Sequence, residues 1–172
     1  MFMNTPIIVI TGAECSGKTT LATQLSKRWG RPLVPEIARN YLEKTPNYHR
    51  DDLLIIAKLQ HEKEREILNQ SLNKIICDTD LLVIMIWSEF KYGTCDPWIY
   101  NTFEKTLKRD KLDRHYLLCD YKIPWEHDGL RENPNNRGEL FNRYTEKLQH
   151  YGLAHSSVTG GKKERLEKIL LF

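Results

Sequence analysis

The residues with the clearest chemical potential run from Gly12 to Thr19 and read Gly-Ala-Glu-Cys-Ser-Gly-Lys-Thr. They fit the pattern G-x-x-x-x-G-K-[ST], which is typical of loops that bind the phosphates of nucleoside triphosphates. Glycines let the backbone N–H groups of such a loop turn toward phosphate oxygens. The lysine reaches the β- and γ-phosphates, and the final hydroxyl is a ligand for Mg²⁺. The sequence therefore predicts a site for ATP and Mg²⁺.

The sequence on either side of this loop supports the interpretation. Residues 7–11 form a β-branched apolar run, as expected of a buried parallel strand, and residues 20–29 carry apolar side chains at helical spacing. A strand, a phosphate loop and a helix N-terminus in this order favour an anion site over a turn that binds nothing. The residues expected to hold the nucleotide are Gly12, Ala13, Glu14, Cys15, Ser16, Gly17, Lys18, Thr19 and Thr20, joined by Arg137 from a later loop.

Acidic residues stand at the ends of three further apolar runs. Asp78 and Asp80 close the run that begins at Asn73, Glu36 closes residues 33–36, and Asp120 closes residues 115–120. An enzyme that transfers phosphoryl groups needs an acidic group near Mg²⁺, often at such a strand end. Asp78 or Asp80 could hold Mg²⁺ or accept the proton of an acceptor hydroxyl. The alternative for this pair is to cap the helix that begins near residue 81.

Glu36 is a second candidate for the carboxylate beside an acceptor hydroxyl, which a small-molecule kinase requires. Arg39 lies one helical turn further on and could position a phosphate or the substrate. The alternative is an ion pair on the surface. Tyr41 on the same predicted helix could line the pocket or pack in the core.

Residues 121–138 are polar and rich in Pro, Asn, Asp and Arg, and we interpret them as a lid. A tryptophan such as Trp125 in a polar stretch can stack on a flat, electron-poor ring. Arg131 and Arg137 are suited to stabilising charge on a transferring phosphoryl group. The alternative is an irregular surface loop with Trp125 folded into the core. His127 is not expected to be catalytic.

These residues must be positioned by alternating strands and helices. Strands are predicted at 7–11, 33–36, 73–80, 115–120 and 154–158, and helices at 20–29, 37–44, 51–73, 81–91, 98–109, 138–151 and 162–171. This alternation predicts an α/β fold with a five-stranded parallel sheet, helices on both faces and a lid. Pro35 places the second strand at or near an edge or mouth of the sheet. The charged run 61–66 is expected to face solvent. Ligands of such sheets gather beyond the carboxyl ends of the strands.

Composition narrows the functional classes. The chain has 172 residues, enough for one domain, and a formal charge of +3, which is too small to indicate nucleic-acid binding. Its four cysteines are scattered without a C-x-x-C pair, so disulfide and zinc frameworks are not expected. With neither a signal segment nor a long apolar span, we expect a cytoplasmic protein without membrane contact. Cys15 is interpreted as a small tolerated residue.

Four stretches together resemble one known family. They are the phosphate loop, E-x-A-R-x-Y from Glu36 to Tyr41, D-T-D from Asp78 to Asp80, and W-x-x-D-G-L-R from Trp125 to Arg131. In this order they resemble the ribosylnicotinamide kinase domain of the bacterial multifunctional NAD-biosynthesis protein, over nearly the whole chain. The resemblance implies a P-loop kinase-like three-layer fold with a mobile lid. It also implies transfer of the ATP γ-phosphate to the 5′-hydroxyl of nicotinamide riboside, giving nicotinamide mononucleotide.

The resemblance also implies roles for individual residues. Trp125 would stack on the nicotinamide ring, and Asp78 would lie near Mg²⁺ together with Thr19. Glu36 or Asp80 would act on the acceptor hydroxyl. The residues expected to contact the substrate are Glu36, Arg39, Tyr41, Asp78, Asp80, Trp125 and Asp128. Those expected to be catalytic are Lys18, Glu36, Asp80 and Arg131.

One departure from the family is plain. In the multifunctional protein the kinase follows an adenylyltransferase domain, for which 172 residues leave no room, and the chain has no H-x-G-H signature. We therefore expect no adenylyl transfer. Two other functions remain open: a kinase of another nucleoside or small metabolite, and an ATP-binding regulatory switch. The carboxylates and the arginine-bearing lid favour a kinase over a switch.

Overall fold

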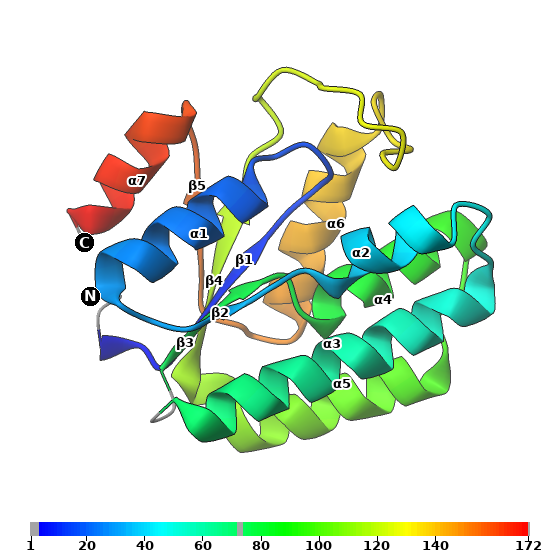
Figure 1. Ribbon diagram of the computed structural model, residues 1–172, viewed down its shortest axis with the longest axis horizontal. Coiled ribbons are helices and arrows are strands. Elements are labelled where there is room, and N and C mark those ends of the chain that lie inside the picture. Colours follow the sequence, from blue (N-terminus) through cyan, green and yellow to red (C-terminus); the bar gives the residue numbers. More distant parts are fainter. Residues whose placement is uncertain (1–3, 72–73, 172) are drawn as a thin grey trace.

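Five parallel strands form one sheet in the order β2-β3-β1-β4-β5, and helices cover both of its faces (Figure 1). The computed structural model describes residues 4–71 and 74–171. The strands are β1 (Ile7–Thr11), β2 (Leu33–Val34), β3 (Ile75–Asp78), β4 (Arg114–Cys119) and β5 (His155–Val158). The helices are α1 (Lys18–Trp29), α2 (Ile37–Lys44), α3 (Arg50–Gln70), α4 (Leu81–Tyr92), α5 (Pro97–Asp110), α6 (Arg137–His150) and α7 (Lys162–Leu170). A short 3₁₀ helix, η2 (Lys111–Asp113), leads into β4.

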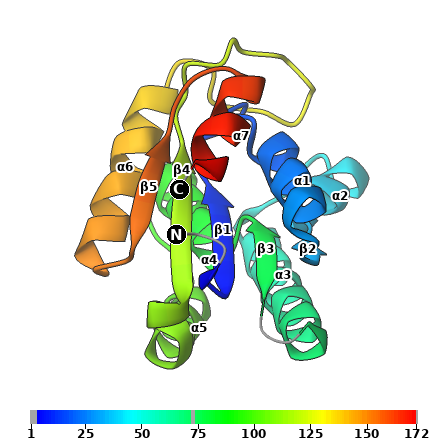
Figure 2. The ribbon, with the colours of Figure 1, turned by 90° about the vertical axis from the view of Figure 1, so that its left-hand side faces the viewer.

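The central strand β1 is apolar along its whole length because both of its faces are covered. Its alternate residues enter two separate cores, Ile7 and Val9 on one face and Ile8 and Ile10 on the other. The first core contains side chains from α3, α4, α5 and α6, and the second contains side chains from α1 and α7. Figure 2 shows α7 in front of the strands and α4 behind them. The predicted five-stranded parallel sheet with helices on both faces is therefore confirmed.

The short strand β2 confirms the prediction made from Pro35. It pairs with β3 and forms one edge of the sheet, directly before that proline. At the other elements the differences are small. Helix α1 begins at Lys18 rather than at Thr20, since the phosphate loop leads directly into the helix. The predicted start of the third strand at Asn73 lies outside the described residues.

The prediction that residues 61–66 face solvent is wrong for Glu64, whose side chain is 3% exposed. Its carboxylate accepts a hydrogen bond from the guanidinium of Arg114, which is itself buried at the start of β4. Arg114 also binds Asp110, at 2.9 Å, and Asp80, at 3.5 Å. A buried carboxylate is tolerated where it is paired, and here the partner comes from a neighbouring strand. The resulting network joins α3, the end of α5, β4 and the start of α4.

Residues 120–136 connect β4 to α6 without helix or strand and pass over the edge of the sheet where β1 ends (Figure 1). This segment is most of the predicted lid, whose last two residues already belong to α6. Among the described helices, none combines the length and the apolar content needed to cross a membrane.

Candidate functional site

The phosphate loop connects β1 to α1 through backbone conformations that require glycine. At Gly12 the φ angle is +137°, and a Cβ atom there would lie 2.7 Å from the carbonyl oxygen of Cys119 on β4. Gly17 has a φ of +77° and immediately precedes α1. Cys15 adopts a left-handed φ of +53° without being glycine. The loop is thus wound around the N-terminus of a helix, which is a favourable place for an anion.

A cavity of about 320 Å³ opens above this loop. Its lining includes each of the predicted nucleotide-binding residues from Gly12 to Thr20. Glu36 and Arg39 at the start of α2 also line it, as does Arg131 of the lid. The fold therefore brings the donor loop into one space with three of the residues predicted for the acceptor and the transferring group.

The rest of the cavity wall is apolar and was not predicted. Trp87 and Phe90 on α4 form its aromatic part, and Tyr144 on α6 contributes a phenol. The other residues of this wall are Ala38, Leu42, Val83, Ile86, Leu130 and Leu140, with Asn133 at the lid. Their helical spacing is visible in the sequence, but it is equally typical of a core-facing stripe. The lining thus combines the predicted phosphate loop with aromatic and apolar side chains, as in sites for small ligands.

Asp78 lies buried beside the phosphate loop at the end of β3. Burial, reinforced by the negative charge of Glu36, raises the pKa of its carboxyl to about 6, although a hydrogen bond from Thr19 and the charge of Lys18 oppose the shift. The next residue, Thr79, is β-branched yet has a φ of +72°. Such a strained conformation is uncommon and clusters at functional sites.

Thr19 and Asp78 fit the part of the site that would hold Mg²⁺. Asp78 Oδ1 is buried and has no hydrogen-bond partner among the described residues, so it is free to face a cation. Carboxylate and hydroxyl oxygens are ligands that Mg²⁺ prefers, usually together with phosphates and water. No group of three or more His, Cys, Asp or Glu side chains suited to a metal occurs in residues 4–71 and 74–171. The donors present therefore fit an ion shared with bound phosphates rather than one enclosed by protein alone.

Asp80 does not line the cavity, and the geometry favours the capping alternative for it. One carboxylate oxygen accepts the N–H of Leu82 at 3.0 Å, which caps α4, and the other accepts the Tyr116 hydroxyl at 2.6 Å. Burial raises the pKa of Asp80 to about 6, against the opposing charge of Arg114. We therefore withdraw Asp80 from the acceptor side, because its oxygens are directed into the buried network around Arg114.

Besides Asp78 and Asp80, four predicted residues lie outside the cavity lining. The Tyr41 hydroxyl donates to Asp52 at 2.6 Å. Trp125 is half-buried, with the guanidinium of Arg137 lying 5.6 Å from its ring centroid. Arg137 also donates to the carbonyl of Ile123 at 2.7 Å, so it holds the lid.

Asp128, the fourth of these residues, lies outside the cavity lining but binds two residues that belong to it. Its carboxylate binds Arg39 at 3.0 Å and Arg131 at 3.1 Å. Asp128 therefore holds together two arginines that line the cavity, one from α2 and one from the lid.

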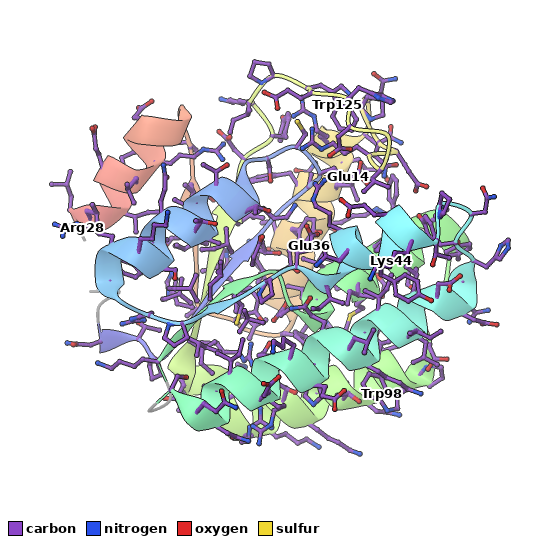
Figure 3. All side chains as sticks on the ribbon, in the orientation of Figure 1. Glu14, Arg28, Glu36, Lys44, Trp98 and Trp125 are labelled. Atoms are coloured by element: carbon purple, nitrogen blue, oxygen red, sulfur yellow. The ribbon has the colours of Figure 1, made fainter. Side chains whose placement is uncertain are left out.

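The lid is fastened to the phosphate loop by a clasp made of Glu14 and Cys15. The Glu14 carboxylate accepts the N–H groups of Glu132 and Asn133 at 2.9 and 3.0 Å. The Cys15 sulfur accepts the N–H of Glu126 at 3.2 Å. Figure 3 shows Glu14 below the lid that carries Trp125, with Glu36 deeper in the molecule. Glu14 and Cys15 thus hold the lid over the loop. They occupy variable positions of the phosphate-loop pattern, so the sequence does not indicate this role.

Helix α7 supports the phosphate loop from the opposite side through Arg165, which is 1% exposed. Its guanidinium donates to the carbonyl of Ser16, to the Asp120 carboxylate and, at 2.8 Å, to the carbonyl of Gly160. The pair is buried and hydrogen-bonded, so losing either partner would leave an uncompensated charge. This contact was not predicted, since nothing in the spacing of residues 162–170 distinguishes Arg165 from the other basic residues in the sequence of that helix.

The chain matches a family described as an AAA domain over residues 7–165. A solved structure of NadR protein in complex with NR superposes with a TM-score of 0.70 at 17% identity, covering 95% of this chain and 49% of that one. Deoxyadenosine kinase from M. mycoides, with the products dCMP and a flexible dCDP bound, gives a TM-score of 0.66 at 18% identity, covering 96% and 97%.

A second NadR structure, in complex with NAD and AMP-PNP, gives a TM-score of 0.66 at 15% identity and covers 96% of this chain and 49% of that one. The chain therefore spans about half the length of the NadR chains. No curated protein matches the chain. At these identities the likeness shows the fold, which is the α/β P-loop kinase-like fold.

Removing the Glu14 carboxylate should loosen the lid without disturbing the sheet. In Glu14→Ala two charge-assisted hydrogen bonds to the lid backbone are lost, so the amides of Glu132 and Asn133 should exchange with solvent about tenfold faster. Hydrogen–deuterium exchange resolved by peptide measures this, with β1 as the internal reference. Glu14→Gln, which keeps one accepting oxygen, should show a smaller increase. Unchanged exchange in both variants would rule out the clasp.

Asp78→Asn should change the pH dependence of stability. The pKa of Asp78 is raised in the folded state, so its contribution to stability is complete below its unfolded pKa near 4 and is lost as the pH rises through about 6. Asparagine carries no charge at either pH. Urea unfolding without Mg²⁺ or nucleotide should therefore show the variant roughly 2 kcal/mol more stable than the wild type at pH 8. Near pH 4 the two should be equal; a difference independent of pH would contradict the assignment.

Proposed function

We propose that this chain, which belongs to the AAA domain family, is an ATP-dependent kinase that phosphorylates the 5′-hydroxyl of nicotinamide riboside, giving nicotinamide mononucleotide. The observation that carries the proposal is the single cavity that joins the phosphate loop to Glu36, two arginines and an aromatic wall. The order of the four sequence motifs, and a NadR structure in complex with NR among the similar folds, support the riboside as acceptor.

The donor half of the site consists of the phosphate loop and the residues beside it. Lys18, whose ammonium donates to the Ala13 carbonyl at 2.9 Å, lies where it can transfer that interaction to the β- and γ-phosphates. The backbone N–H groups of the loop and the start of α1 attract the phosphate oxygens. Thr19 and Asp78 would hold Mg²⁺, which when bound neutralises charge on the phosphates.

The acceptor half centres on Glu36, which lines the cavity at the start of α2. Its carboxylate takes the proton of the 5′-hydroxyl as that oxygen forms a bond to the γ-phosphorus. The bond from the γ-phosphorus to the bridging oxygen breaks, and ADP leaves. Arg39 and Arg131, held by Asp128, neutralise the transferring group. The clasped lid excludes water, which would otherwise compete with the acceptor.

The nicotinamide ring of the acceptor is expected to stack on the aromatic residues of α4. Trp87 and Phe90 line the cavity, whereas Trp125 lies outside its lining and faces Arg137. A nicotinamide riboside ring is flat and cationic, so it is attracted to the π face of an aromatic side chain. We therefore assign base stacking to Trp87 and Phe90, in place of the Trp125 suggested by the family resemblance.

A kinase of another nucleoside is the second candidate. The deoxyadenosine kinase from M. mycoides matches this chain over 97% of its own length, whereas the NadR chains do so over only 49%. An apolar wall that stacks on a ring can accept several bases, because stacking depends little on base identity. The regulatory-switch alternative accounts less well for a carboxylate and two arginines facing the same space as Lys18.

Turnover of ATP against a panel of nucleosides tests the proposal. Nicotinamide riboside should be converted to its mononucleotide with a kcat/KM at least about tenfold above that of cytidine, uridine or deoxyadenosine. Lys18→Ala should abolish transfer while leaving the circular dichroism spectrum unchanged. Product from the other nucleosides alone would select the second candidate, and no product from any of them would select the regulatory switch.

The assignment of the base site is tested by two tryptophan variants. Trp87→Leu keeps an apolar side chain but removes the π face, so it should raise the KM for nicotinamide riboside about tenfold and leave the KM for ATP unchanged. Trp125→Leu is the matched control and should change the riboside KM by less than about threefold. Steady-state kinetics on both variants decides the assignment. A larger increase of the riboside KM in Trp125→Leu than in Trp87→Leu would instead assign ring stacking to Trp125.

A further inference from the structure

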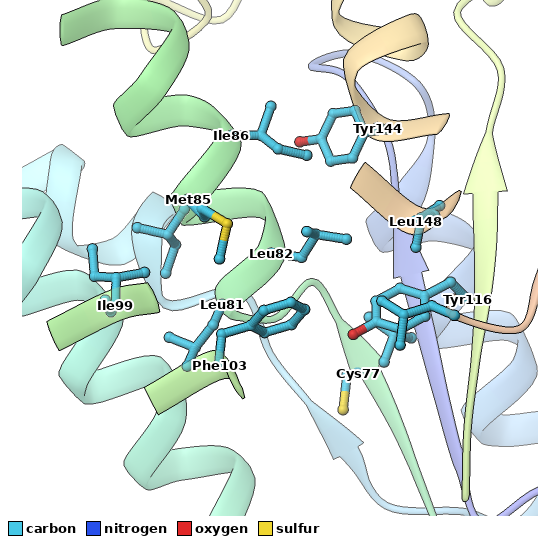
Figure 4. Close-up of a cluster of buried hydrophobic side chains, with 14 of the residues drawn as sticks. Cys77, Leu81, Leu82, Met85, Ile86, Ile99, Phe103, Tyr116, Tyr144 and Leu148 are labelled. Carbon is cyan, nitrogen blue, oxygen red and sulfur yellow. The ribbon is translucent and has the colours of Figure 1, made fainter. Parts of the chain in front are cut away.

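Tyr144 on α6 is a buried side chain whose hydroxyl makes no hydrogen bond to the described part of the protein and is not sealed from the cavity. Its side chain is 4% exposed and lines the cavity. Within residues 4–71 and 74–171 the structure gives its hydroxyl no hydrogen-bond partner. Figure 4 shows this oxygen directed from α6 toward Ile86 of α4. The oxygen therefore faces the space between the two helices that carry the apolar wall.

The hydroxyl of Tyr144 differs from that of a tyrosine packed in the core. A fully buried tyrosine hydroxyl normally finds a partner in the protein, whereas this oxygen is open to the cavity and has none among the described residues. The neighbouring core shows the ordinary arrangement, since the fully buried Tyr116 donates to Asp80 at 2.6 Å. A polar group left unpaired at a cavity wall is available to a ligand.

The surroundings of Tyr144 determine what it can offer. Burial, together with the negative charges of Glu36, Glu14 and Asp80, holds the pKa of the phenol well above its usual range. The group is therefore neutral at physiological pH and carries a proton to donate. Glu36, the carboxylate assigned to the 5′-hydroxyl, lines the same cavity as Tyr144. The donor and the group that takes the proton of the acceptor therefore face one common space.

We propose that Tyr144 is a specificity-determining residue that donates a hydrogen bond to the 2′- or 3′-hydroxyl of the acceptor sugar. The inference rests on the proposed function, because it takes the acceptor to be a riboside with its 5′-hydroxyl at Glu36. The sugar lies next to that reacting oxygen, whereas the base extends toward Trp87 and Phe90, which offer π faces. A site built to bond a substrate hydroxyl rejects analogues that lack it. Tyr144 therefore selects the sugar, while the aromatic wall selects the ring.

The test combines one substitution with two altered substrates. Tyr144→Phe removes only the oxygen, so kcat/KM for nicotinamide riboside should fall about tenfold or more, mainly through KM, with the KM for ATP unchanged. One of the 2′-deoxy and 3′-deoxy analogues should be about as poor a substrate for the wild type as the riboside is for the variant. For that analogue the substitution should make no further difference.

A purely structural role for Tyr144 would weaken the reaction of the riboside and of both deoxy analogues alike. The comparison between the three substrates therefore distinguishes that role from a hydrogen bond to the sugar. Tyr144→Phe should unfold at about the same temperature as the wild type, because the hydroxyl that it removes makes no hydrogen bond within the described part of the chain. The control Tyr116→Phe should unfold at a lower temperature and keep the wild-type discrimination between riboside and deoxyribosides. If Tyr144→Phe weakens the riboside and both analogues by one common factor, or weakens none of them, the inference is overturned.

Binding measurements separate this inference from the proposed function. Calorimetric titration of nicotinamide riboside and its two analogues into the wild type and Tyr144→Phe requires no turnover. Riboside binding that is weaker in the variant, with one analogue unaffected, supports Tyr144 even if phosphoryl transfer is not observed. Equal riboside affinity of the two proteins overturns the inference alone. Failure of all three ligands to bind the wild type overturns it together with the proposed function.

Discussion

Where β1 ends, the backbone at Gly12 passes so close to β4 that a Cβ atom would lie 2.7 Å from the carbonyl oxygen of Cys119. This approach is possible because β1 lies between β3 and β4, with its residues in parallel register with both. The same register brings the carboxyl ends of the three strands together, so Asp78 and Asp120 flank the phosphate loop. The charged groups of the site are therefore neighbours because of backbone packing, although they are far apart in the sequence.

The D-T-D stretch shows how two adjacent acids can serve different purposes. Thr79, with its left-handed φ of +72°, separates Asp78, which lies beside the phosphate loop, from Asp80, which caps α4. Asp80 also belongs to the buried network of Arg114, Glu64 and Asp110. The strained residue between them is held by a backbone hydrogen bond from its N–H to Ile10 at 3.1 Å. The uncommon conformation of Thr79 is therefore held by its own backbone hydrogen bond and by the hydrogen bonds of the adjacent Asp80.

The phosphate loop, the alternation of strands and helices and the edge position of β2 were predictable, because each depends on residues close together in the sequence. Both roles now given to Asp78 and Asp80 were also foreseen, but their division between the two acids required tertiary contacts. Glu64 was misjudged because helical periodicity shows which residues share a face and not which neighbour covers that face. Trp87 and Tyr144 were not predicted as site residues for the same reason, since side chains that face a cavity and side chains that face the core have the same helical spacing.

Arg165 contacts the carbonyl of Ser16 across a separation of 149 residues. Contacts between such distant parts of a chain form late, because a long loop must close before they contribute. The rear of the phosphate loop is therefore fixed by a contact that forms only when α7 docks against it. A chain in which α1 has folded but α7 has not docked lacks this contact.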